Sequence, residues 1–156
     1  MDDPDTSEQE MRAYHEAGHA VALCLLGLGL SEVSIKEQGD TEGHACPDPK
    51  CNPDVELRRR LELDVISFLA GNLAMDHHYG GYYRHACRQR DEEAVCDLCL
   101  QAEEFGERPS ELRTKLESET KQLLHDNWGA VDKLARELLL REELSGAKAC
   151  QIIRSV

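Results

Sequence analysis

The sequence predicts a mostly α-helical (α+β) domain: a helical bundle with a small β-hairpin beside a helix that carries an H-E-x-x-H motif. Aromatic residues make up only 4% of the chain, so aliphatic side chains and alanine must fill the core, which suits helix packing. Apolar residues recur at helical spacing in most segments, whereas strict alternation is confined to residues 32–36. The length suits a single domain spanning residues 1–156.

The first helix is expected from about Ser7 to Leu26, after an acidic start over residues 1–6 that we expect to be disordered. Ser7 can cap its N-terminus, and Gly27 suits the position just beyond its C-terminus. Its buried face is predicted from the apolar residues that recur at helical spacing, namely Tyr14, Ala17, Val21 and Leu25.

The rest of the chain predicts one hairpin followed by further helices. Residues 32–36 read as a strand, Gln38-Gly39-Asp40 as a turn and residues 41–46 as the partner strand. The proline-rich residues 47–53 predict a loop. Helices are then expected at about 55–77, 90–104, 109–125, 127–141 and 145–153, with a loop at 79–83.

The stretch His15-Glu16-Ala17-Gly18-His19 is the most informative part of the chain. In a helix, His15 and His19 lie one turn apart on one face, where two imidazoles can share one zinc ion. Glu16 then lies beside the metal and can act as a general base. The competing interpretation is an accidental match with two solvated histidines. Gly18, unusual inside a helix, favours a close approach of backbone or substrate there.

A catalytic zinc site needs a third protein ligand and an open position for water. The extended pattern H-E-x-x-H-x-x-G-x-x-H is absent from the chain. The residue pattern alone leaves seven downstream candidates for the third ligand: Asp76, His77, His78, His85, Asp91, Glu92 and Glu93.

Residues 14–21, Tyr-His-Glu-Ala-Gly-His-Ala-Val, resemble the start of the peptidase domain of FtsH-type ATP-dependent zinc proteases. The resemblance covers roughly residues 11–153, and its weaker matches follow in the family's order at 32–35, 42–44, 68–74, 90–94 and in the C-terminal helices. It implies His15, His19 and Asp91 as zinc ligands and Glu16 as base. Without the resemblance, Asp91 reads better as an acid stabilised by a helix N-terminus.

The chain also departs from that family. It has no ATPase module, no phosphate-binding G-x-x-x-x-G-K-[ST] motif and no transmembrane anchor. Asn72 and Met75-Asp76 replace the family's Arg and Glu, residues 83–89 replace its Thr-Gly-Ala-Ser segment, and the loop at 47–53 is rebuilt. These changes affect the expected substrate cleft and the contacts of a hexameric ring more than the proposed zinc ligands.

Seven cysteines in a chain without a recognisable export signal predict free thiols in a reducing compartment. Cys96 and Cys99 form a C-x-x-C on a predicted helix, where two buried apolar side chains are the preferred interpretation. The less favoured alternative is a second, structural zinc site with ligands from among Cys46, Cys51, Cys87, Cys96 and Cys99.

His44 and His85 are further candidates to lie near the catalytic zinc and polarise a substrate carbonyl.

The charge balance of 18 basic against 31 acidic residues, a net −13, argues against nucleic acid or an anionic membrane as a partner. The triplet Arg58-Arg59-Arg60 is expected to be a solvated helix face.

No apolar run approaches the roughly 20 residues that a membrane helix needs. The acidic N-terminus lacks the basic start of a signal peptide. We therefore expect a soluble, cytoplasmic protein, and the start at Met1 favours a full-length chain.

These observations predict a zinc metallopeptidase: an endopeptidase that hydrolyses peptide bonds in flexible or unfolded polypeptides through a zinc-activated water, with Glu16 as general base. The expected partners are the peptide substrate, a separate ATPase that delivers it, or further copies of the chain. The alternative is a catalytically weak or inactive peptidase-like zinc-binding module that captures peptides or protein partners. A third interpretation is a purely structural metal held by four protein ligands.

Overall fold

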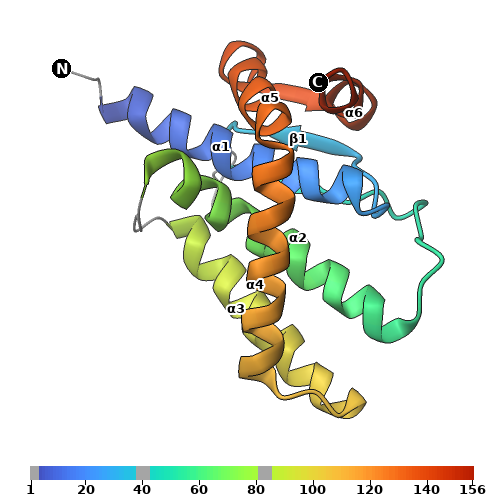
Figure 1. The fold of residues 1–156 in the computed structure, drawn as a ribbon. Helices are drawn as coiled ribbons and strands as arrows, with labels where there is room; N and C mark the ends of the chain where they lie inside the picture. The colour runs from blue at the N-terminus through green and yellow to red at the C-terminus, as the bar shows by residue number, and fades with distance from the viewer. Residues whose placement is uncertain (1–3, 38–42, 81–85) are drawn as a thin grey trace.

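The computed structural model describes residues 4–37, 43–80 and 86–156, and these form a helical domain with a small sheet (Figure 1). The mostly α (α+β) prediction is confirmed. The helices are α1 Pro4–Leu25, α2 Leu57–Tyr79, α3 Ala86–Gln101, α4 Pro109–Asp126, α5 Trp128–Arg141 and α6 Gly146–Arg154, with a 3₁₀ helix, η1, at Ala102–Phe105. The strands are β1 Glu32–Ser34, β2 His44–Cys46 and β3 Glu143–Ser145.

The sheet contains the predicted hairpin and one strand that was not predicted. Its order is β2-β1-β3, with both pairs antiparallel, and Val33 at the centre of β1 faces Ala45 on one side and Leu144 on the other. Residues 143–145 are too few to produce a readable alternation, which is why β3 was missed. The expected turn at residues 38–40 lies outside the described residues, as do 41 and 42 of the expected second strand.

Helix α1 lies between α2 on one side and β1 with α6 on the other (Figure 1). A Cβ atom at Gly18 would lie 2.5 Å from the carbonyl oxygen of Ala70 and 2.6 Å from Cβ of Ala74, both on α2. Gly18 therefore allows the backbones of α1 and α2 to approach closely, which confirms that a close backbone approach explains this glycine. The main core surrounds α1, and a second core cluster includes Ile66 of α2 and Leu116 of α4.

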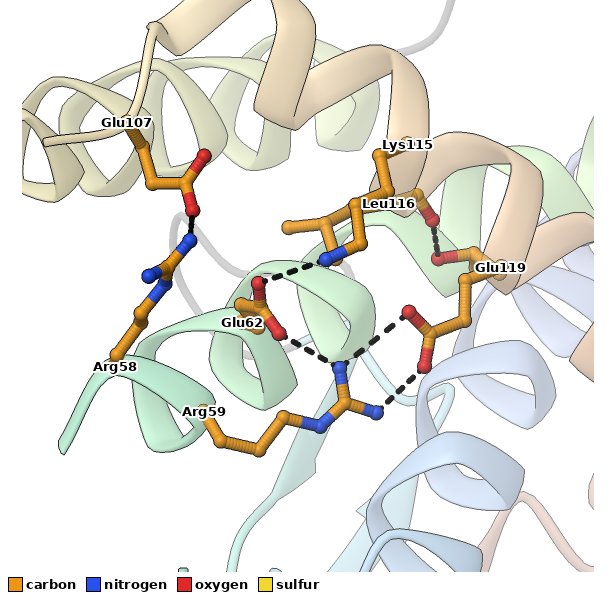
Figure 2. Close-up of polar contacts among 8 residues, drawn as sticks. Arg58, Arg59, Glu62, Glu107, Lys115, Leu116 and Glu119 are labelled. Atoms are coloured by element: carbon orange, nitrogen blue, oxygen red, sulfur yellow. Dashed lines mark hydrogen bonds and ion pairs between the residues drawn. The ribbon is translucent and has the colours of Figure 1, made fainter. Parts of the chain in front are cut away.

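The basic triplet on α2 is not a merely solvated face, because its arginines pair with acids (Figure 2). Arg59 donates to the buried carboxylate of Glu62 at 2.8 Å and to Glu119 of α4 at 2.6 Å, while Lys115 donates to Glu62 at 3.4 Å. Arg58 pairs with Glu107, and Arg60 pairs with Asp64 at 3.3 Å. Residues 58–60 are partly solvated, as predicted, since the Arg58 side chain is 51% exposed and those of Arg59 and Arg60 are more than a third exposed, but their pairing with acids was not predicted.

Several helix boundaries differ from the predicted ones. Helix α1 begins at Pro4, three residues before the predicted start at Ser7, while residues 1–3 lie outside the described part. Helix α3 begins at Ala86, so Asp91 lies in its second turn and is not the N-terminal acid that we considered. The break between α4 and α5 falls at Asn127, and Gly129 lies inside α5.

A disulfide bond joins Cys24 at the end of α1 to Cys150 on α6. The prediction that all seven cysteines are free thiols is therefore wrong for this pair, which lie 126 residues apart in sequence. Cys46, Cys51, Cys96 and Cys99 are free. Among the described residues, no helix is both long and apolar enough to cross a bilayer.

Candidate metal centre

Three potential ligand atoms converge between α1 and α3. Nε2 of His15 and Nε2 of His19 lie 3.0 Å apart, and Oδ2 of Asp91 lies 3.0 Å from the first and 2.9 Å from the second. A tetrahedral zinc ion with metal–nitrogen distances of about 2.0–2.1 Å holds its ligand atoms about 3.3 Å apart. The three atoms are therefore close to the spacing that one zinc ion requires.

Helix geometry and a missing side chain together form this arrangement. The histidines occupy positions i and i+4 of α1, so both imidazoles point from one face toward α2 and α3. Gly71 of α2 faces them: a Cβ atom there would lie 2.6 Å from Cε1 of His19 and 2.8 Å from Cε1 of His15. The space taken by the two rings therefore requires glycine at position 71. This role of Gly71 was not predicted, although a glycine inside a predicted helix is a signal that the sequence shows.

The orientation of His19 is set by a backbone contact from α2. Nδ1 of His19 lies 2.6 Å from the carbonyl oxygen of Ser67. A carbonyl oxygen only accepts hydrogen bonds, so Nδ1 carries the proton and donates it. In the neutral ring, Nε2 is then left with its lone pair directed at His15 and Asp91. Metal-binding histidines are commonly held by such a second hydrogen bond. Nothing in the sequence pointed to Ser67.

The charges of the three groups depend on one another. Burial disfavours the charged imidazole of His19, but the neighbouring Asp91 carboxylate outweighs it and raises the pKa of His19. Burial alone would raise the pKa of Asp91, yet His19 and His15 hold it well below its usual value. Without a metal, the site thus favours a cationic imidazole beside a carboxylate. A bound divalent cation would replace that proton.

Glu16 lies in the same cavity, one residue after the first histidine. Its carboxyl group is buried, and its pKa is raised to about 7 overall: burial is the main cause, the charge of His19 opposes it, and the charge of Asp91 adds to it. A carboxyl group with a pKa near neutrality suits a group that accepts and returns a proton at pH 7. Glu16, the predicted general base, thus lies in the same cavity as the three predicted ligands, and its raised pKa lets it exchange a proton near pH 7.

The cavity has a volume of about 270 Å³ and is bounded by α1, α2, α3 and β2. Apolar side chains of Leu23, Leu28 and Phe68 line part of it, and Gly43 to Ala45 form the wall along the sheet. Strand β2 passes close to the base, since a Cβ atom at Gly43 would lie 3.4 Å from Cγ of Glu16. A larger groove of about 750 Å³ between α2, α3 and α4 includes none of the four predicted site residues.

Of the seven candidates for the third ligand, the described side chains bring only Asp91 to the histidines. Five others have different partners. Asp76 pairs with Arg88, Glu92 pairs with Arg113, and the rings of His77 and His78 pack against Trp128 and Tyr14 respectively. Glu93 accepts a hydrogen bond from Gln89 at 3.2 Å. His85 lies outside the described residues.

The cysteine-only metal site is not formed by the side chains that the structure describes. Cys51, Cys96 and Cys99 belong to no group of converging ligand atoms there, and the side chain of Cys87 lies outside the described part. Cys46 instead converges with Glu32 and His44 on the sheet. Burial, followed by the charges of Glu32 and Glu16, raises the pKa of the Cys46 thiol. His44 lines the cavity wall, near the histidine pair as predicted.

Comparison of the chain with protein-family models and with curated proteins finds no match, so the interpretation of the centre depends on its own geometry and chemistry.

Proposed function

We propose that this protein is a zinc-dependent endopeptidase. The observation that carries the proposal is the convergence of His15, His19 and Asp91 from two helices, with the buried carboxyl group of Glu16 beside them. Two imidazoles and one carboxylate that can bind a metal ion, with a glutamate beside them as general base, are the groups that metal-assisted hydrolysis requires.

The residues fit zinc on several grounds. Imidazole nitrogen and carboxylate oxygen are accepted zinc ligands, and three of them leave one coordination position open. The three atoms lie 2.9–3.0 Å apart, and the Ser67 carbonyl fixes the tautomer of His19. When bound, zinc would polarise a peptide carbonyl and lower the pKa of a bound water.

The chain's own groups then perform the proton transfers. Glu16, whose pKa burial raises to about 7, takes a proton from the attacking water and delivers it to the leaving amine. Strand β2 is an edge strand of the sheet within the described residues and borders the cavity. Its outer edge offers main-chain hydrogen bonds to an extended peptide, with the scissile bond facing Glu16. Leu23, Leu28 and Phe68 offer apolar contacts to a substrate side chain.

This geometry favours extended substrates. A peptide that adds to a strand edge must lack its own secondary structure, so we propose flexible or unfolded polypeptides as the substrate class. Folded substrates would need to be unfolded by an ATPase, since residues 1–156 contain no G-x-x-x-x-G-K-[ST] motif.

The test combines zinc analysis with cleavage of an unfolded, fluorescently labelled polypeptide. Glu16→Gln should keep the zinc content of the wild type and lose about 10²–10⁴-fold in kcat, because the amide accepts no proton. Glu8→Gln, at an exposed position of the same helix, is the matched control and should cleave like the wild type. Equal rates for the Glu16→Gln and wild-type proteins would refute the proposed mechanism.

The second variant of this test, Asp91→Ala, removes the ligand that α3 contributes. It should contain one zinc fewer per chain than the wild type by elemental analysis and should have no activity. Undiminished zinc content would mean that Asp91 is not a ligand. Wild-type zinc without cleavage, together with saturable binding of the peptide, would favour the peptidase-like capture module instead.

A further inference from the structure

A second cluster of ligand-type side chains lies on the hairpin. The register pairs Glu32 of β1 with Cys46 of β2, and Ser34 with His44. His44 and Cys46 are two residues apart on one strand, so their side chains point to the same face. One ligand atom from each of Glu32, His44 and Cys46 lies within 4.8 Å of the other two. None of the three atoms belongs to the centre between α1 and α3.

The chemistry of the cluster is that of a soft metal site. We propose that Glu32, His44 and Cys46 bind a divalent ion such as zinc or cadmium as a second metal site. A thiolate beside an imidazole favours these ions over magnesium and calcium, which prefer oxygen ligands alone. Three protein ligands satisfy most of a tetrahedral coordination shell and leave one position for water.

The hairpin holds these ligands near their positions before any ion arrives. Nε2 of His44 lies 2.7 Å from a carboxylate oxygen of Glu32, so two of the three groups already meet. The carbonyl oxygen of Cys46 accepts hydrogen bonds from the backbone N–H of Ser31 at 2.9 Å and from its hydroxyl at 3.2 Å. The Sγ atom of Cys46 already lies within 4.8 Å of the other two ligand atoms, so small side-chain movements suffice for binding, which keeps its entropic cost low.

The position of this cluster connects it with the cavity. All three residues are half-buried, and His44 lines the wall that β2 contributes. An ion bound to these three residues would lie on one face of the β1–β2 hairpin, at the edge strand β2. A simple ion pair between His44 and Glu32 is the competing explanation, and that pair involves no sulfur.

Cadmium titration monitored by near-ultraviolet absorption separates the two explanations. A bond between thiolate and cadmium produces a charge-transfer band, and the centre of His15, His19 and Asp91 contains no thiol that could contribute to it. We expect the band in the wild type in thiol-free buffer, with the final amplitude of one thiolate–cadmium site per chain. The same band should appear in the His15→Ala/His19→Ala variant.

Substitutions on the hairpin then identify the ligands. Cys46→Ser should abolish the band, and His44→Ala should weaken cadmium binding at least tenfold. Cys51→Ser, which removes an exposed free thiol five residues further on, is the matched control and should keep the band. Circular dichroism of each variant checks that it is folded.

Absence of the band in the wild type, or an undiminished band in folded Cys46→Ser protein, would overturn the proposal. Peptidase activity plays no part in this measurement. A chain that binds cadmium through Cys46 but cleaves nothing would thus refute the proposed function and leave the second site standing.

Discussion

Gly71 has no side chain, and the rings of His15 and His19 occupy the space beside it. At the scale of single residues, the centre thus depends on a position that offers no ligand at all. The Ser67 carbonyl, which orients His19 from the same helix, acts in a similar way. The space at Gly71 and the carbonyl group of Ser67 both belong to the backbone of α2. Substituting only the metal ligands would therefore not test what α2 contributes to the centre.

Gly71→Ala should weaken zinc binding at least tenfold, because the new Cβ would lie 2.6 Å from Cε1 of His19 and displace the ring. Overpacking of this kind also lowers the free energy of unfolding by about 1–3 kcal/mol. Zinc affinity can be measured by competition with a chromogenic chelator. Gly129→Ala is the control, since its Cβ would meet only Cγ1 of Val156 at 3.0 Å, at the exposed end of the chain. Equal zinc affinity of the wild-type and Gly71→Ala proteins would contradict this account.

At the scale of elements, ion pairs join α2 to α4 beside the second core cluster (Figure 2). Burial alone would raise the pKa of Glu62, but hydrogen bonds from Arg59 and Lys115 together lower it below its usual value. A depressed carboxylate pKa in the folded state stabilises the fold above the pKa of the unfolded chain, about 4.3. This stabilisation is lost as the pH falls through the lower folded-state value.

Glu62→Gln should therefore lower the free energy of unfolding by about 1–3 kcal/mol at pH 7, because the amide has no negative charge and replaces one of the two oxygens that accept from Arg59 and Lys115 with a donor. The difference from the wild type should shrink as the pH falls below about 4.3, where Glu62 of the unfolded chain begins to take up a proton, and should vanish once the folded-state carboxylate is also protonated. Urea unfolding at several pH values measures both effects. Glu104→Gln, at an exposed position of η1, should unfold like the wild type throughout. A pH-independent difference would show that the charge of Glu62 is not the cause.

At the scale of the whole molecule, α1 organises the domain. It contacts α2, α5 and α6 as well as β1 and β2. The disulfide between Cys24 and Cys150 ties the end of this helix to α6, close to the C-terminus. The helix that carries the histidines is therefore fixed both by packing and by a covalent link that closes a long loop.

Removal of that link by Cys24→Ala/Cys150→Ala should lower the free energy of unfolding by about 2–5 kcal/mol, because the unfolded chain regains the freedom of the open loop. Denaturant unfolding of the oxidised wild type and the double variant measures the change. Cys51→Ser, which leaves the link intact, is the control. Alkylation under denaturing conditions followed by mass measurement should find two protected cysteines in the wild type. Full alkylation without a reductant would contradict the link.

The sequence alone determined the helical class, the hairpin and the pair of histidines on one helix face, because helical spacing and alternation are short-range properties that a few neighbouring residues express. Glu16 was predicted as the general base in the same way. Asp91, 72 residues from His19, was expected only through a family resemblance, and the packing of α3 against α2 decided that it lies beside the histidines.

Other features depended on the tertiary structure entirely. The space at Gly71, the pairing of Cys24 with Cys150 and the convergence of Cys46 with Glu32 and His44 all join residues whose local patterns carry no sign of one another. Each depends on how helices and strands pack, and many distant residues together decide that packing. Short-range periodicity therefore identified the helix that carries the two histidines, whereas tertiary packing decided which distant groups surround them.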